Sequence, residues 1–386
     1  MQTHRRLFVA GSLLLVALAG LGLWVMLSSR YRAVPPPAPT RRVEPLVPTP
    51  LPASPSTSAT AATSQPLPTA SPKGSPAQIS VSDRARIGVG FPSGAPGDYD
   101  WGGQLPGWYL NWGVREHPDR PDGIEFAQMV RLRQDKFSPS LPTIAAAARS
   151  NPGALWLIGN EPDVAWQDNA TPEQYAASYQ RVRQAIKEAD PTARVAIGGV
   201  SQPTPLRFQY LDLILDAYRQ QFGAPMPVDV WNVHAFILRE EVDSWGVGVP
   251  PGMSVDRGQL FEIADHGDLE TFRRQIVGFR RWMADHGLRE EPLIISEYGL
   301  LMPESYGYPA SRVADFLIDT FDYLLTARDP EIGMPGDDYR LVQAFCWFSV
   351  ADDLYPTPNL FDPETGLRTE VGDALVSYLA GLRQVD

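Results

Sequence analysis

Residues 79–386 are predicted to form an α/β barrel of eight parallel strands, a (β/α)8 TIM barrel. Short β-rich runs occur eight times in this stretch, helical patterns follow the later runs, and neither a second linker nor an internal repeat interrupts it. Strands that alternate with helices typically close into such a barrel. The eight runs are residues 86–91, 107–112, 125–132, 154–159, 194–200, 229–236, 292–296 and 341–350.

The helices are expected mainly in the second half of the barrel. The sequence TPEQ at residues 171–174 has the form of a capping box with Pro at the first helical position, and this helix should end near residue 190. Apolar residues at near-helical spacing predict helices over 269–283 and 313–324. The first two connections are short and rich in Gly, Pro and Asp, so we expect reduced or absent helices in the first half.

The N-terminal residues 1–34 predict a membrane anchor. Residues 7–27 are mostly apolar and uncharged, which is long enough to cross a bilayer, and basic residues flank both ends. We expect a single-pass signal-anchor in the cell membrane with its N-terminus inside and the folded domain extracellular. The alternative is a cleaved signal peptide, which would make the protein secreted.

Residues 35–78 predict a disordered linker rich in Pro, Ser and Thr. The segment contains thirteen prolines and almost no large apolar side chain. In an extended polyproline conformation it could hold the domain up to roughly 130 Å from the bilayer. It could equally be a tether whose length has no special role.

The net charge and the cysteine and histidine content indicate which partners and metal ions the chain can bind. The first 78 residues carry seven Arg or Lys against one Glu, a balance of +6, so a net charge of −12 leaves −18 for the rest. This acidity argues against nucleic acid as a partner. Cys346 is the single cysteine, and the five histidines lack the spacing of a metal motif. We therefore expect a monomer with no metal and no cofactor.

Two glutamates stand at the ends of predicted strands. Glu161 follows the fourth strand and Glu297 follows the seventh, and the carboxyl ends of barrel strands are where barrel enzymes carry their catalytic groups. Cleavage of a glycosidic bond needs a proton donor and a negative charge on opposite sides of the sugar, which two carboxyl groups can supply. Alternatively, each Glu could simply belong to a polar turn.

The surrounding residues resemble a known enzyme clan. LIGNEPD at residues 157–163 and IISEYG at residues 294–299 are similar to the fourth-strand and seventh-strand motifs of clan A glycoside hydrolases. The resemblance implies a retaining enzyme in which Glu161 is the acid/base and Glu297 the nucleophile. Glu161 would then be protonated near neutral pH and Glu297 ionised, with His234 or Tyr298 available to hydrogen-bond the nucleophile.

The same resemblance implies supporting roles. Asn160 would bind the sugar 2-hydroxyl, His234 would lie near the nucleophile, and Trp347 would stack under the sugar. Tyr298 is a further candidate for substrate binding. His234 could instead be a core histidine, and strand alternation leaves core packing open for Trp347.

Within the clan, GWYLNW at residues 107–112 and GIEF at residues 123–126 are similar to the family 128 endo-β-1,3-glucanases, although a family 39-like or family 5-like member would share both Glu motifs. Residues 237–268 form the longest connection after a strand and are expected to build a cleft wall. Trp112, Trp166 and Trp245 are candidates for stacking on sugar rings, and Trp245 could alternatively pin the loop to the barrel.

The expected function is therefore that of a retaining glycoside hydrolase acting on β-linked polysaccharide, most simply an endo-β-glucanase. A carbohydrate-binding pseudoenzyme and a stalked scaffold domain at the cell surface are the alternatives.

Overall fold

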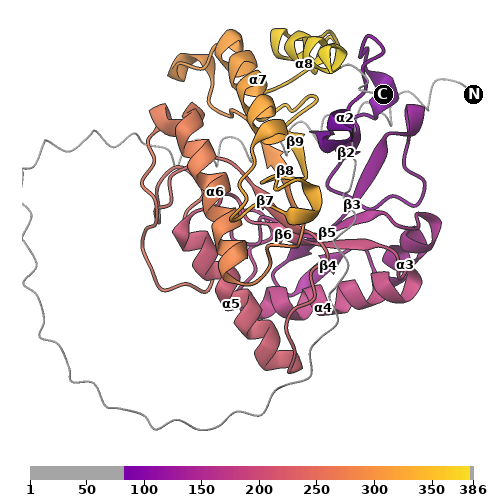
Figure 1. Cartoon of the computed structure of the whole chain (residues 1–386), viewed down its shortest axis with the longest axis vertical. Helices are drawn as coiled ribbons and strands as arrows, with labels where there is room; N and C mark the ends of the chain where they lie inside the picture. The colour runs from indigo at the N-terminus through magenta and orange to yellow at the C-terminus, as the bar shows by residue number, and fades with distance from the viewer. Residues whose placement is uncertain (1–81, 383–386) are drawn as a thin grey trace, which may run out of the picture. The chain divides into compact units, whose positions relative to one another are not determined.

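The computed structural model describes residues 82–382 (Figure 1). The anchor expected over residues 1–34 and the linker expected over 35–78 lie outside the described residues. Between residues 82 and 382, none of the helices combines the length and apolarity that a bilayer crossing requires.

Eight parallel strands form the barrel, as the sequence predicts. They pair in the order β6-β5-β3-β2-β1-β9-β8-β7. The ring closes between β6 and β7 through the parallel bridges Ala196–Val230 and Val200–Val233. The strands are β1 (Ile87–Gly90), β2 (Trp108–Leu110), β3 (Glu125–Arg133), β5 (Leu155–Asn160), β6 (Arg194–Gly199), β7 (Trp231–His234), β8 (Leu293–Tyr298) and β9 (Ala344–Trp347). A further strand, β4 (Lys136–Ser138), pairs antiparallel with β3.

Helices surround the second half of the barrel, and the predicted helices are confirmed (Figure 1). In the capping box, the Thr171 side chain accepts from the Gln174 amide and the Gln174 side chain accepts from the Thr171 amide. The helices are α2 (Asp83–Arg86), α3 (Leu141–Ser150), α4 (Pro172–Ala189), α5 (Pro205–Phe222), α6 (Leu269–Asp285), α7 (Ala310–Thr326) and α8 (Glu370–Gly381).

The first half of the barrel is reduced, as expected. The connections from β1 to β2 and from β2 to β3 contain only the short 3-10 helices η1 (Pro96–Asp98) and η2 (Pro121–Gly123). Aromatic side chains pack where a helix would otherwise lie: the Phe91 ring is 6.0 Å from Trp101 and 5.2 Å from Tyr109. Large rings thus supply the apolar contact that the missing helices would provide.

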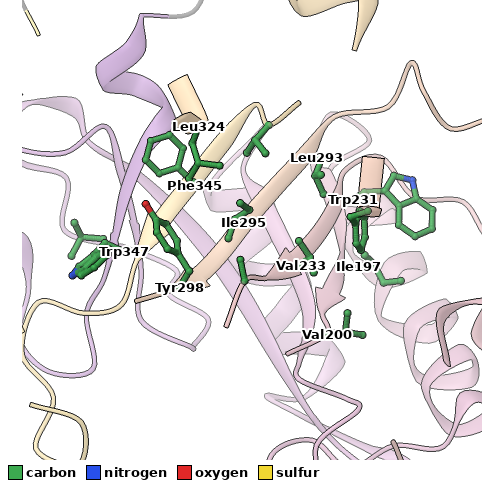
Figure 2. Close-up of a cluster of buried hydrophobic side chains, with 14 of the residues drawn as sticks. Ile197, Val200, Trp231, Val233, Leu293, Ile295, Tyr298, Leu324, Phe345 and Trp347 are labelled. Carbon is green, nitrogen blue, oxygen red and sulfur yellow. The ribbon is translucent and has the colours of Figure 1, made fainter. Parts of the chain in front are cut away.

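The core has two layers, because successive residues of a strand point to opposite sides. The barrel interior is filled by smaller side chains such as Leu157, Ala196 and Ile294. The layer between the strands and the helices holds larger ones, including Trp231, Tyr298 and Trp347 (Figure 2). The carboxyl ends of the strands lie above the inner layer, so the inward position at each strand end faces the site.

Candidate active site

Glu161 and Glu297 meet at the carboxyl end of the barrel. Glu161 directly follows β5 and Glu297 is the fifth residue of β8, and the two residues are only 7% and 6% exposed. An oxygen of each lies within 4.8 Å of the other and of a ring nitrogen of His234. Oxygens this near to one another fit carboxyl groups about 5–5.5 Å apart, as in retaining glycosidases, better than the roughly 6.5–9.5 Å of inverting enzymes.

His234, the last residue of β7, lies between the two carboxylates. Its Nδ1 is 2.9 Å from Glu161 Oε1. Its Nε2 is 3.4 Å from Glu297 Oε1, close enough for charge attraction but without hydrogen-bond alignment. Burial opposes protonation of this ring, but the Glu297 and Glu161 carboxylates outweigh it and raise the pKa of His234. Gly199 makes room for it, because a Cβ there would lie 2.6 Å from His234 Cδ2.

Trp112 donates an indole hydrogen bond to the second carboxylate. Trp112 Nε1 lies 2.5 Å from Glu297 Oε1. Gly90 leaves space for the indole, since a Cβ at that position would lie 2.8 Å from Trp112 Cη2. Trp112 is thus a neighbour of the carboxylate and packs edge-on against Phe348, with ring centroids 5.7 Å apart.

The Glu297 carboxyl group does not have the low pKa that the sequence analysis expects of a nucleophile. Burial raises the pKa of Glu297 to about 7, the Glu161 charge adds to that increase, and His234 and Trp112 oppose it. Glu297 is therefore only partly ionised at neutral pH. The physical reason is the depth of the site, which removes water from the carboxylate.

The backbone around Glu161 is specialised. Glu161 has a φ of 45°, in the left-handed region that a non-glycine residue occupies at a cost of about 1–3 kcal/mol. Its amide donates to the Gly199 carbonyl at 2.9 Å, which holds the turn after β5 against β6. Next to it, the buried Asn160 Oδ1 has no hydrogen-bond partner among the described residues and is free to accept a substrate hydroxyl.

Trp347 and Tyr298 do not reach the cleft, so their predicted substrate contacts are wrong. Both are fully buried in the helix-facing layer, where their rings pack edge to face 5.4 Å apart (Figure 2). Trp347 Nε1 donates to the Pro358 carbonyl at 2.9 Å, and the Tyr298 hydroxyl lies beside Thr320 of α7. In β9 the cause is strand alternation, which turns Trp347 outward and Phe348 inward. In β8 the pairing register shifts between Ile295 and Tyr298, so Tyr298 points to the same side as Ile295 and Glu297 faces the site.

A cleft of about 290 Å³ opens beside the two carboxylates. Trp166 and Trp245 line it, and so do residues of the predicted wall 237–268. The lining residues are Glu161, Trp166, Gln167, Phe236, Leu238, Trp245, Gly246, Val247, Glu297, Leu301, Met302, Phe348 and Tyr355. Among the residues 82–382 that the structure describes, the two glutamates are the only charged side chains that line this cleft.

Phe348 and Tyr355 are cleft residues that the sequence analysis missed. Strand alternation next to Trp347 was the available signal for Phe348. No comparable signal exists for Tyr355, which belongs to the loop after β9. Its amide donates to Asp352 Oδ1 at 2.7 Å, so Asp352 orders this loop.

Within residues 82–382, Glu161, His234 and Glu297 are the one group whose side chains could supply three metal ligands. Both nitrogens of His234 already face carboxylate oxygens, at 2.9 and 3.4 Å. The neighbouring carboxylates raise the pKa of His234, which strengthens proton binding to the ring at the expense of metal ligation. The arrangement suits the sharing of protons between three buried groups.

Comparisons with known proteins agree with this fold. Residues 92–245 match the protein family described as "Glycosyl hydrolase catalytic core". Similar solved structures include a family 128 subgroup II endo-β-1,3-glucanase from Sorangium cellulosum, with 18% identity, coverage of 76% of this chain and 98% of that chain, and a TM-score of 0.51. No curated protein sequence matches the chain.

Two other solved structures have the same fold. A family 128 subgroup III curdlan-specific exo-β-1,3-glucanase from Blastomyces gilchristii, in complex with glucose, is 18% identical, with coverage of 76% of this chain and 98% of that one and a TM-score of 0.51. A glucosidase from Croceicoccus marinus is 15% identical, with coverage of 78% and 68% and a TM-score of 0.51. At these identities the likeness concerns the fold.

Proposed function

Because the chain is a glycoside hydrolase with the TIM-barrel fold of clan A, we propose that it cleaves a β-linked glucan with retention of anomeric configuration. Our specific assignment is an endo-β-1,3-glucanase. The observation that carries the mechanism is the convergence of Glu161, His234 and Glu297 within 4.8 Å at the ends of β5, β7 and β8.

The proposed reaction is a double displacement. Glu297 attacks the anomeric carbon while Glu161 gives its proton to the leaving glycosidic oxygen, and a glycosyl ester forms on Glu297. Glu161 then takes a proton from water, which attacks the same carbon and releases Glu297. The 2.5 Å hydrogen bond from Trp112 to Glu297 and the nearby His234 ring support the ionised form of the nucleophile against its burial.

The lining of the cleft favours a neutral glucan. In the described part of the chain, no Lys or Arg lines it to pair with a uronate or sulfate group. It does contain Trp166, Trp245, Phe348 and Tyr355, whose rings can pack against the apolar faces of glucose units. The β-1,3 linkage is proposed by analogy with the family 128 enzymes of similar fold, which include both endo- and exo-acting members.

We place this activity outside the cell on the basis of the sequence alone. The apolar segment 7–27 and the Pro-rich segment 35–78 support a single-pass anchor and a stalk, or secretion if the anchor is cleaved. The protein would act as a monomer on polysaccharide, without a cofactor. Membrane fractionation of the native protein, followed by alkaline extraction, checks the anchor.

The decisive experiment measures reducing-sugar release by the purified full-length protein from β-1,3-, β-1,4- and mixed-linkage glucans. Glu161→Gln and Glu297→Gln should each lower kcat at least about a thousandfold, because each removes a group that bonds or protonates the reacting atoms. Glu304→Gln, at an exposed position, is the control. Binding of glucan without release of sugar would instead favour the pseudoenzyme alternative.

Azide rescue separates the two roles. In Glu297→Ala, azide entering from the nucleophile side should give the α-glycosyl azide from an activated β-glucoside. In Glu161→Ala, azide attacks the glycosyl ester and should give the β-glycosyl azide. The opposite pattern of anomers, read by NMR, would reverse the two assignments.

A further inference from the structure

Arg207 is a buried arginine that contacts both the turn carrying Glu161 and the cleft wall. It lies in the first turn of α5 and is fully buried. Its guanidinium contacts two segments at three points: the turn that carries Glu161, the predicted wall at Glu240, and the wall again at Val247 and Gly248. A buried arginine loses its hydration, so all of these contacts are needed to compensate for its burial.

The first contact reaches the turn after β5. Arg207 Nε donates to Asp163 Oδ2 at 3.1 Å, and Asp163 is two residues beyond Glu161. Asp163 is itself fully buried, and its Oδ2 accepts a 2.7 Å hydrogen bond from the Ser201 hydroxyl. The Val164 amide donates to the Glu161 carbonyl at 3.1 Å, so Asp163 belongs to the same backbone turn as Glu161.

The second contact is with Glu240, near the start of the cleft wall. Arg207 Nη1 lies 2.8 Å from Glu240 Oε1, an ion-pair contact without hydrogen-bond alignment. Glu240 Oε2 accepts from the Gln259 amide at 2.6 Å. Gly258 permits this approach, because a Cβ there would lie 2.1 Å from Glu240 Oε2. Glu240 therefore joins the start and the end of the wall.

The third contact is with the part of the wall that faces the cleft. Arg207 Nη2 donates to the Gly248 carbonyl at 3.0 Å and lies 3.4 Å from the Val247 carbonyl. Val247 and its near neighbour Trp245 line the cleft. The Val247 amide donates to the Arg239 carbonyl at 2.9 Å, which folds this part of the wall back on its own base.

We propose that Arg207 is a positioning residue that sets the spacing between the acid/base turn and the cleft wall, and thereby controls the binding of extended glucan chains. The substrate part of this inference rests on the proposed function. The structural part, that one guanidinium holds the wall, does not depend on which reaction the enzyme performs.

Lysine cannot replace this arginine. The planar guanidinium directs its N–H groups along several fixed directions, whereas an ammonium group is a single point of charge at the end of a flexible chain. Arg207→Lys keeps the positive charge between Asp163 and Glu240 but cannot also reach the Val247 and Gly248 carbonyls. The wall should therefore loosen while the charge balance of the buried cluster is preserved.

Arg280→Lys is the matched control. Arg280 is also fully buried, but its guanidinium donates to the carbonyls of Arg289, Glu291 and Ile332. None of these residues lines the cleft. A general penalty for shortening a buried arginine would appear in both variants, whereas an effect on the wall should appear only at Arg207.

The test measures amide hydrogen exchange and kinetics on the full-length protein. In Arg207→Lys, the amides of Val247 and Gly258 should exchange at least about tenfold faster than in the wild type, because the contacts that close the wall are lost. KM for laminarin, a β-1,3-glucan, should rise about tenfold with kcat changed less than about threefold. Arg280→Lys should leave both the wall amides and KM unchanged.

Two results would overturn the proposal: wall amides that exchange no faster in folded Arg207→Lys, or an equal increase in exchange and KM in Arg280→Lys. If Arg207→Lys does not fold, Glu240→Gln decides the question, because it removes one ion-pair partner without removing the arginine and should accelerate the same amides. If the wild type releases no sugar from any glucan, the proposed function fails. The exchange result still tests whether Arg207 holds the wall.

Discussion

Neighbouring residues at the ends of β8 and β9 have opposite surroundings. Glu297 and Phe348 face the cleft, whereas Tyr298 and Trp347 pack against the helices. Trp347 has a hydrogen-bond partner in the Pro358 carbonyl. Glu297, by contrast, is a carboxyl group whose ionised form is disfavoured, because burial raises its pKa to about 7. The cleft side of a strand is therefore arranged for chemistry at some cost in stability, and the helix side for stability alone.

The largest expected difference is between Glu297→Gln and Tyr298→Phe. Glu297→Gln should lower kcat at least about a thousandfold, whereas Tyr298→Phe should leave it within about twofold, because this hydroxyl has only a weak 3.4 Å contact with Thr320. Parallel measurements of kcat and Tm test the contrast. Equal losses of activity in both variants would show that the two sides of β8 are not functionally distinct.

Glu297→Gln should also be more stable than the wild type at neutral pH. The folded-state pKa of Glu297, about 7, lies above the usual 4.5, so the folded protein binds the extra proton. The carboxyl group therefore costs stability increasingly as pH rises from about 4.5 to about 7, and the cost is largest above that range. The Tm advantage of Glu297→Gln should be present at pH 8 and absent at pH 4.

The next contrast is between Trp347→Ala and Phe348→Ala. Removing the fully buried Trp347 should lower the free energy of unfolding by about 3–5 kcal/mol, because it leaves a large cavity between β9 and α7. Phe348→Ala should cost less stability but raise KM several-fold. Urea unfolding and steady-state kinetics measure both. A Trp347→Ala variant with full stability but a raised KM would show that Trp347 contacts the substrate.

The pH profile should place the acidic limb of kcat/KM near pH 7. The nucleophile must be ionised, and burial together with Glu161 raises the pKa of Glu297 to about 7. Activity should therefore increase about tenfold per pH unit as pH approaches 7 from below. A limb near pH 4–5 would mean that Glu297 is ionised much more easily than its burial implies.

The smallest effect is expected at the edge of the cleft. Trp166 and Tyr306 are each 57% exposed, but Trp166 lines the cleft and Tyr306 does not. Trp166→Ala should raise KM for polymeric glucan about threefold to tenfold, the equivalent of losing one stacking contact of about 1 kcal/mol. Tyr306→Ala should leave KM unchanged, and both variants should keep the wild-type Tm. Equal KM values in the two variants would remove Trp166 from the binding surface.

Much of the fold was predictable because its signals are local. The capping box at Thr171 defined the start of α4, and the short Gly- and Pro-rich connections indicated the reduced first half. The apolar runs before Glu161 and Glu297 identified β5 and β8. These features depend on hydrogen bonds and side-chain spacing within a few residues, which a sequence displays directly.

The site was predictable only in part. The two carboxylates, His234 and Trp112 meet where their strand ends suggested, but Trp347 and Tyr298 do not. Alternation says that neighbours in a strand face opposite sides without saying which side is the cleft. That choice depends on the tilt and closure of the whole barrel.

The sequence by itself determined the eight barrel strands and the helices α4, α6 and α7, and it placed two glutamates at the ends of two of those strands. Only the tertiary structure decided which neighbours accompany them. The raised pKa of Glu297 arises from its burial. The contacts of Arg207 join α5 to the turn after β5 and to the wall, over sequence separations of about forty residues. Burial and long-range contacts are properties of the closed barrel, so no local pattern contains them.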